Sequence, residues 1–313
     1  MGATYALTAE GLSKTYNGMF ALKDVNFTWA KGILGLIGPN GAGKSTLIKI
    51  ISTLIRPKTG SATVFGKDVL KESFEVRQRI GVLHENPYFH PNLRVLSSLI
   101  WVGELRGLSS ARVNQTVCDL LEFFDLASVK RSHLKELSAG MRQKYGLIHA
   151  TIGFPPLIIL DEPTSNLDPE ARRKYETYVT KLSKEHQCSF LISSHVLGEL
   201  NRICDGYIFL FNGEITEAGK RDELILKSSS QRFRLVTQFS QQLVPLLVDF
   251  DIEVEQIGEG EIIVVAKNYK ELLHIKSQIP DPSLSSTMEI YALETEIDSL
   301  FRELHDKHKV RGD

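Results

Sequence analysis

A glycine-rich segment between two apolar runs constrains the fold of this chain more than any other feature. It reads Gly38-Pro-Asn-Gly-Ala-Gly-Lys-Ser45 and matches the phosphate-binding loop pattern G-x-x-x-x-G-K-[ST]. The short apolar run at residues 33–37 favours a strand before it, and residues 47–51 favour a helix after it. Strand, loop and helix in this order are the context that the pattern requires. The segment therefore predicts a nucleoside triphosphate site.

The residue types of this loop suit an anion. Glycines let the backbone wrap closely with its N–H groups inward, and the positive end of the following helix faces the same anion. We expect Lys44 to reach the β- and γ-phosphates and the Ser45 hydroxyl to ligate Mg²⁺. A glycine-rich turn with a solvated lysine is the plainer alternative. The residues expected to bind the nucleotide here are Gly38, Pro39, Asn40, Gly41, Ala42, Gly43, Lys44, Ser45 and Thr46.

Composition narrows the class of protein. A chain of 313 residues has room for about two domains. Its net charge of −1 gives no general electrostatic reason to bind nucleic acid or anionic lipid. The three cysteines lack metal-ligand spacing and favour a reducing cytoplasm. No apolar run approaches the roughly 20 residues that span a bilayer, so work at a membrane would need a partner.

Two acidic residues follow the aliphatic run at residues 157–160. Such a run fits a strand buried on both faces of a parallel sheet, and ligands lie at the carboxyl ends of such strands. We expect Asp161 to hold Mg²⁺ and Glu162 to polarise the attacking water. His195 ends a further apolar strand at residues 188–194. Alternatively, the two acidic residues simply end a strand in solvent, and the histidine is an ordinary polar residue at a strand end.

Two further positions have local interpretations. Tyr16 precedes the turn Asn17-Gly18, in a stretch of short strands that predicts a small antiparallel sheet. Its ring either packs on a strand face or stacks on adenine, a contact worth about 1–3 kcal/mol by analogy with nucleic-acid sites. Asp168 and Pro169 predict the N-cap and first residue of a helix.

A third motif distinguishes this chain from the many other enzyme classes that share a phosphate-binding loop. Leu137-Ser-Ala-Gly-Met-Arg-Gln143 lies between the phosphate loop and the acidic strand. With it, residues 4 to about 225 resemble the ATP-binding cassette (ABC) ATPases. The resemblance implies an α/β fold, a P-loop NTPase core with an N-terminal antiparallel sheet and a helical insert at about residues 88–150. It rests on Tyr16, the loop, Glu85, this signature, Asp161-Glu162 and His195.

The resemblance implies a composite active site. Two nucleotide-binding domains face each other head to tail in this family, and the signature residues of one contact the γ-phosphate bound by the other. Ser138 and Gly140 would make this contact, so the chain should act as a dimer, with a homodimer expected. The implied cofactors are ATP and Mg²⁺. The implied catalytic residues are Lys44, Glu162 and His195, and the implied metal ligands are Ser45, Glu85 and Asp161.

The sequence departs from the family pattern at three positions. Ala139 and Met141 stand where the commonest signature has Gly and Gln. Glu85 occupies the position usually held by a metal-sensing glutamine. Its carboxylate still offers oxygen to Mg²⁺ but adds negative charge near Asp161 and Glu162. Because Glu162 is retained, we expect hydrolysis.

A composition shift near residue 227 predicts two domains. Residues 1–227 would form the ATP-binding domain, residues 228–230 a polar hinge, and residues 228–313 an accessory α+β domain of βαββαβ-like order. This extension resembles that of single-cassette ATPases serving drug- and polyketide-type exporters. Its closing helix either caps its own domain or serves regulation or dimer contact.

The resemblance implies a subunit that couples ATP hydrolysis to transport, with export expected, through separate membrane permeases. We expect it at the inner face of the cell membrane, docked through a groove around residues 85–96. Tyr88, Phe89 and Pro91 either receive a permease loop or pack under the helical insert. The alternative is a non-transport ABC ATPase in translation, DNA repair or cofactor assembly. A non-hydrolysing scaffold would be expected to lack Glu162.

Overall fold

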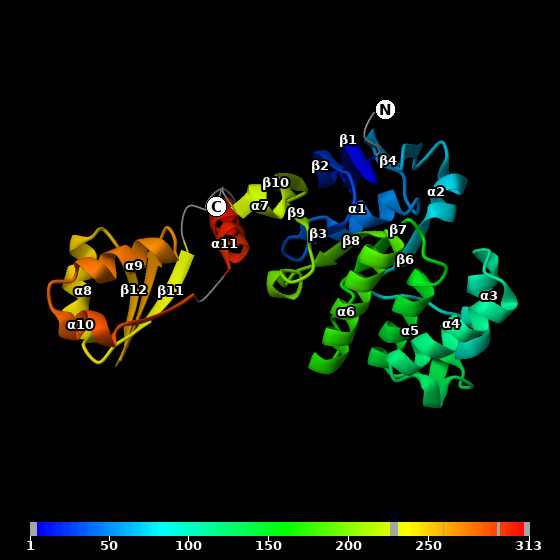
Figure 1. The fold of residues 1–313 in the computed structure, drawn as a ribbon. Coiled ribbons are helices and arrows are strands. Elements are labelled where there is room, and N and C mark those ends of the chain that lie inside the picture. Colours follow the sequence, from blue (N-terminus) through cyan, green and yellow to red (C-terminus); the bar gives the residue numbers. More distant parts are fainter. Residues whose placement is uncertain (1–4, 226–230, 259, 293–294, 310–313) are drawn as a thin grey trace. The chain divides into compact units, whose positions relative to one another are not determined.

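The computed structural model describes residues 5–225, 231–258, 260–292 and 295–309. These residues form two compact units, the first ending at Gly219 and the second beginning at Lys220 (Figure 1). The domain boundary predicted at residue 227 and the hinge at residues 228–230 lie outside the described residues. None of the described helices is long and apolar enough to cross a membrane.

A sheet with parallel central strands forms the middle of the first unit. Its described strands, in spatial order, are β10 (Glu214–Lys220), β9 (Gly206–Phe211), β3 (Ile33–Ile37), β8 (Ser189–Ser194), β7 (Leu157–Asp161) and β6 (Ile80–Leu83). Strand β8 pairs in parallel with both β3 and β7, and every residue of these three strands is buried. A sheet covered on both faces needs such continuous runs of buried residues. The apolar runs in the sequence therefore predicted the central strands correctly.

The first unit also contains the antiparallel sheet that the turn-rich N-terminal sequence predicts. Its described strands, in spatial order, are β2 (Met19–Trp29), β1 (Leu7–Tyr16), β4 (Thr59–Val64) and β5 (Lys67–Asp68). Asn17 and Gly18 join β1 to β2 with positive φ angles of 50° and 83°, as a two-residue hairpin turn requires. Helix α1 (Lys44–Ile51) contacts β2, β4 and β7, so one apolar core joins the two sheets.

Helices account for most of the segment predicted as a helical insert, residues 88–150. The described helices of the first unit are α1, α2 (Ser73–Arg79), α3 (Val95–Leu105), α4 (Ser110–Phe123), α5 (Ala139–Thr151), α6 (Pro169–His186) and the short 3₁₀ helices η1 (Ala127–Val129), η2 (Leu134–Glu136) and η3 (Leu197–Glu199). Val117, Leu121 and Phe124 are buried at helical spacing along α4 and its C-terminal end. This part of the chain thus has its own buried apolar residues, and Figure 1 shows its helices α3 and α4 beside the sheets.

The second unit is built on an antiparallel sheet. Its described strands, in spatial order, are β12 (Glu253–Gly258), β13 (Glu261–Ala266), β11 (Gln231–Val236) and β14 (Glu289–Ala292), and the helices between them are α8 (Ser240–Asp249), α9 (Tyr269–Gln278) and α10 (Pro282–Thr287). This agrees with the expected βαββαβ-like order, apart from α10, which the sequence did not predict. Residues 283–287 are mostly Ser and Thr, which are weak helix formers. Asp281 nevertheless caps α10, because its Oδ1 accepts the Ser283 N–H at 2.8 Å.

The second unit begins and ends with helices that pack together. Helix α7 (Arg221–Ile225) opens it and α11 (Glu296–Lys309) closes it. At the start of α11, Thr295 Oγ1 donates to Asp298 Oδ2 at 2.7 Å and accepts from the Asp298 N–H at 3.2 Å, a reciprocal cap. Ile297 and Leu300, at the spacing seen in the sequence, are buried. The closing helix therefore packs within its own unit.

Candidate active site

The phosphate-binding loop lies close to one strand of each sheet of the first unit. A methyl group added at Gly38 would lie 2.2 Å from the carbonyl oxygen of Leu210, and one added at Gly43 would lie 2.3 Å from that of Ala21. Gly43 also has a φ of +107°, a conformation that side chains disfavour. Both positions therefore require glycine, and they bring the loop backbone close to β2 and β9.

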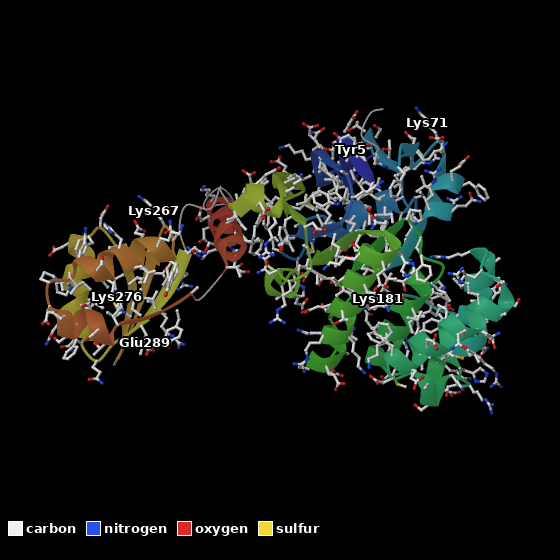
Figure 2. All side chains as sticks on the ribbon, viewed as in Figure 1. Tyr5, Lys71, Lys181, Lys267, Lys276 and Glu289 are labelled. Atoms are coloured by element: carbon white, nitrogen blue, oxygen red, sulfur yellow. The ribbon has the colours of Figure 1, made fainter. Side chains whose placement is uncertain are left out.

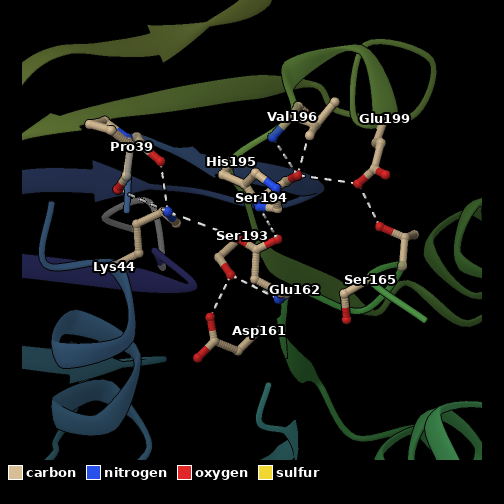
Figure 3. A network of polar contacts seen from close by, with 12 residues as sticks. Pro39, Lys44, Asp161, Glu162, Ser165, Ser193, Ser194, His195, Val196 and Glu199 are labelled. Atoms are coloured by element: carbon tan, nitrogen blue, oxygen red, sulfur yellow. Dashed lines mark hydrogen bonds and ion pairs between the residues drawn. The ribbon is translucent and has the colours of Figure 1, made fainter. Parts of the chain in front are cut away.

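Lys44, the first residue of α1, points back into this loop. Its Nζ donates to the carbonyl oxygens of Gly38 and Pro39 at 2.6 and 3.2 Å, and it lies 3.7 Å from Glu162 Oε1 (Figure 3). Burial lowers the pKa of Lys44, while the charges of Glu162, Asp161 and Glu85 act against that shift. The ammonium group is thus pre-positioned in a pocket where an incoming phosphate would meet it with little competition from water.

The acidic pair lies at the carboxyl end of β7, as the sequence predicts. Asp161 is opposite Ser193 in the pairing of β7 with β8. Ser193 Oγ donates to Asp161 Oδ1 at 2.6 Å and accepts from the Glu162 N–H at 3.0 Å (Figure 3). One serine hydroxyl on the neighbouring strand therefore fixes both acidic residues. Sequence reasoning missed Ser193, because its role depends on the strand register.

Glu162 has the contacts expected of a catalytic carboxylate. Its φ of +49° turns the chain out of the strand, and its Oε2 lies 2.9 Å from His195 Nδ1. Burial raises the pKa of Glu162, and the hydrogen bond and charge of His195 and the charge of Lys44 partly offset this. A partly desolvated carboxylate held by a histidine is suited to accept a proton from water.

A single cavity of about 440 Å³ gathers most of the predicted site. Its lining residues are Tyr16, Ala21, Asn40, Gly41, Ala42, Gly43, Lys44, Ser45, Thr46, Glu85, Glu162, Ser165 and His195. Gly38, Pro39 and Asp161 are not among them, although each bonds or adjoins a residue that is. Ala21 and Ser165 were not predicted; Ser165 had a signal in the sequence, because it closely follows the acidic pair. Tyr16 lines the cavity at its strand end and is 46% exposed, so a base can reach its ring.

Ser138 and Gly140 lie elsewhere and do not line this cavity. Ser138 is the N-cap of α5, where its Oγ accepts the Met141 N–H at 3.2 Å. A methyl group at Gly140 would lie 2.9 Å from the carbonyl oxygen of Asn166. A helix therefore starts at this segment, and the role of both residues toward a second subunit stays a prediction.

The oxygen donors expected to hold Mg²⁺ lie in the cavity or beside it. Glu85 and Ser45 line the cavity and Asp161 lies beside it with its Oδ1 fixed by Ser193. No group of three or more His, Cys, Asp or Glu side chains suited to a metal occurs in the described ranges. Mg²⁺ commonly takes one or two carboxylates and completes its shell with water and substrate phosphates. Hydroxyl and carboxylate oxygens at a phosphate loop therefore fit this ion.

Comparisons with known proteins show what this chain is similar to. A model of the family described as "ABC transporter" matches residues 22–165. The daunorubicin/doxorubicin resistance ATP-binding protein DrrA of Streptomyces peucetius is 31% identical over 89% of this chain and 82% of its own. The uncharacterized ABC transporter ATP-binding protein YcbN of Bacillus subtilis (strain 168) is 34% identical over 75% of each chain. A solved structure described as the ATP binding subunit of an ABC transporter has a TM-score of 0.65 and 30% identity, and the match covers 71% of this chain and 92% of that one.

Proposed function

Because the chain belongs to the ABC transporter family, as one of its ATP-binding ATPase subunits, we propose that it drives export through a separate membrane-spanning permease. The observation that carries the ATP hydrolysis in this proposal is the cavity that brings Lys44, Glu162 and His195 together. A cation for phosphate and a carboxylate paired with a histidine support hydrolysis as well as binding.

Export of a small organic compound is supported by the extent of one relationship. DrrA, named for resistance to daunorubicin and doxorubicin, matches this chain over 280 residues. A match of this length extends beyond the first unit, which ends at Gly219. Non-transport members of the family share the cassette, so the second unit is the feature that favours an exporter. The inferred position is the inner face of the cell membrane, where a permease would hold the chain.

Residues in and beside the cavity have different roles in the proposed hydrolysis. Bound ATP would supply the phosphoanhydride bond that is cleaved, with Mg²⁺ held by Ser45, Asp161 and Glu85. Lys44 and the loop N–H groups bind the phosphates and offset their charge. Glu162 accepts a proton from the attacking water, and His195 holds the Glu162 side chain in place. Tyr16 packs against the base.

The first unit holds only part of the proposed site, and a second copy would complete it. Ser138 opens α5 and its side chain caps the Met141 N–H, and the N–H groups at the start of a helix are suited to bind an anion. Neither Ser138 nor Gly140 lines the cavity of its own chain. A head-to-tail homodimer would bring them to the nucleotide bound by the partner.

The docking surface for the permease is proposed at residues 85–96. A cavity of about 240 Å³ there is lined by Pro87, Tyr88, Phe89, Pro91, Leu134, Lys135 and Arg142. Tyr88 is 85% exposed. Phe89 instead packs edge-on against Tyr145, with ring centroids 4.8 Å apart. Tyr88 is therefore the aromatic available to a permease loop, while Phe89 anchors the segment to α5.

The substitution Glu162→Gln tests the proposed reaction. The amide keeps the size of the side chain but cannot accept the proton, so hydrolysis should fall by about 10²- to 10⁴-fold. ATP binding should persist, because the loop and Lys44 are unchanged. Phosphate release measures turnover, and the ATP-induced rise in melting temperature measures binding. Lys44→Ala is the control that should lose binding. Normal turnover in pure Glu162→Gln protein would reject the role of Glu162.

A further inference from the structure

The carboxylate of Glu199 connects three segments behind the active-site cavity. Glu199 is the last residue of η3, and its side chain is only 15% exposed. Its Oε2 accepts from Thr164 Oγ1 at 2.5 Å and lies 3.3 Å from Ser194 Oγ, whose single proton it shares with the Val196 carbonyl oxygen at 3.1 Å (Figure 3). Its Oε1 forms an ion pair with Arg172 Nη1 at 3.0 Å. The Glu199 side chain thus contacts the segment that follows β7, the last residue of β8 and helix α6.

These contacts adjoin the two residues whose geometry matters most for water activation. Thr164 follows Glu162 by two positions, and Ser194 immediately precedes His195. The Glu162–His195 hydrogen bond is 2.9 Å long, so a small shift of either segment would break it. Glu199 itself does not line the cavity. Any influence on the reaction must therefore pass through the segments that it joins.

Besides the Ser193 hydroxyl, which accepts the Glu162 N–H, two side chains hold the segment that carries Glu162. Gln143 Nε2 of α5 donates to the carbonyl oxygens of Glu162 and Pro163 at 3.3 and 3.0 Å, which holds the segment from one side. Glu199 holds it from the other through the buried Thr164 hydroxyl. Arg172, besides its ion pair, donates from Nε to the Leu167 carbonyl at 3.1 Å. The turn that carries Ser165 is thereby fixed to α6.

We propose that Glu199 is a positioning residue for ATP hydrolysis, which aligns Glu162 and His195 by tying Thr164, Ser194 and Arg172 to one carboxylate. This inference rests on the proposed function, since it concerns the rate of that reaction. In this proposal, Glu199 does not contact the nucleotide. Loss of the carboxylate therefore slows the chemical step and leaves nucleotide affinity in place.

The first experiment compares Glu199→Gln with a matched control. Glu199→Gln keeps the shape but removes the charge that faces Arg172 and one acceptor oxygen. The control is Glu176→Gln, on the same helix as Arg172, where Glu176 pairs with Arg202 at 3.8 Å. We expect Glu199→Gln to lower kcat by about 10- to 100-fold, as small misplacements of catalytic groups do. The KM for ATP and the ATP-induced rise in melting temperature should match the wild type, and the control should retain wild-type kcat.

The second experiment removes only the donor that links Glu199 to the acidic segment. Thr164→Val is nearly isosteric and lacks the hydroxyl, whereas Thr164→Ser keeps it. The proposal expects a fall in kcat for the valine variant and recovery for the serine variant. Glu199→Gln combined with Thr164→Val should cost less than the product of the single effects, because both break the same link.

The outcomes separate this inference from the proposed function. If wild-type protein and its permease-bound form fail to hydrolyse ATP, the proposed function fails and Glu199 has no reaction to serve. If wild-type protein is active and Glu199→Gln retains wild-type kcat, the inference is wrong. It is also wrong if kcat falls only in proportion to lost folded protein or lost ATP binding, because that marks a purely structural side chain.

Discussion

His149 is a half-buried ionisable side chain that the proposed reaction does not use. It lies on α5 against the rings of Phe89 and Tyr145, with centroids 5.4 and 6.0 Å away. Burial, assisted by the positive charge of Arg106, lowers the pKa of His149 from 6.5 to about 4. The folded protein therefore favours the neutral imidazole. Arg106 itself is held by the Ala150 and Ile152 carbonyls at 3.1 and 2.9 Å.

Acid should destabilise the first unit through His149. A depressed folded-state pKa gives stability that is complete above pH 6.5 and is lost as the pH falls toward about 4, up to about 3 kcal/mol in all. Urea unfolding at several pH values measures this change in the free energy of unfolding. In His149→Gln the loss across this window should shrink, while the control His274→Gln on α9 should keep it. An unchanged pH dependence in His149→Gln would contradict the assignment.

Side chains of the site differ in how far the sequence reveals them. Lys44, Asp161 and Glu162 are predictable, because each lies within a contiguous motif whose chemistry is readable from residue types alone. Ser193 and Glu199 are not, since they act through partners about thirty residues away, Asp161 and Thr164. Their hydroxyl and carboxyl groups look like ordinary polar residues until β7 and β8 are paired in register.

Helix α6 begins with a cap that the sequence predicts and the structure confirms. Asp168 Oδ1 accepts the Ala171 N–H at 2.8 Å, and Pro169 is the first helical residue. Removing the cap in Asp168→Ala should lower the free energy of unfolding by about 1 kcal/mol, and Asp168→Asn should largely keep it. Chemical denaturation measures the difference.

The control for this prediction is another helix start. Ser109 is the N-cap residue of α4, and among the described contacts its side chain makes no cap hydrogen bond. Ser109→Ala should therefore cost less than Asp168→Ala. Equal losses at both positions would mean that the Asp168 hydrogen bond contributes little to stability.

Helices and strands were predictable wherever their apolar pattern was strong. The central strands β3, β7 and β8 are continuous buried runs, and α11 has regular helical spacing. Helix α10 was missed, because its Ser- and Thr-rich sequence resembles a loop and only the Asp281-Pro282 start signals a helix. The full pairing order of the strands was not readable, since several neighbours in the sheets, such as β3 and β8, are distant in the chain.

The first unit should fold without the second, and the self-association of a truncated chain should depend on where the chain is cut. A chain ending at Gly219 lacks the whole second unit, whereas one ending at Lys227 keeps α7 and loses α11. Leu224 of α7 is fully buried, and α7 packs against α11. Both truncated chains should bind a fluorescent ATP analogue, and the longer one should self-associate more in light scattering. Failure of both to fold or to bind would refute the two-domain division.

The proposed sharing of the active site between two subunits predicts recovery of activity from two inactive variants. Lys44→Ala and Ser138→Arg homodimers each have a defect in both sites. In a mixed dimer, one site receives both defects and the other receives intact Lys44 and intact Ser138. Phosphate release should therefore reappear on mixing, up to about one working site per mixed dimer if the sites act independently.

Two controls accompany the mixing experiment. Differently tagged variants show whether mixed dimers form and bind ATP, and the permease should be included once it is identified, in case dimerisation needs it. Mixing Lys44→Ala with Lys44→Ala of the other tag should stay inactive. If mixed dimers form, bind ATP and remain inactive beside active wild-type dimers, the shared site or the independence of its two copies must be abandoned.

The packing of α7 against α11 also bears on how such a protein could arise. The chain enters the second unit through α7 and leaves it through α11, so both ends of this unit lie together. A segment with adjoining ends can join or leave a gene by a single fusion or deletion, and it fits into a surface loop of an unrelated host without stretching either partner. Evolution could therefore exchange the second unit while the ATP-binding unit stayed unaltered.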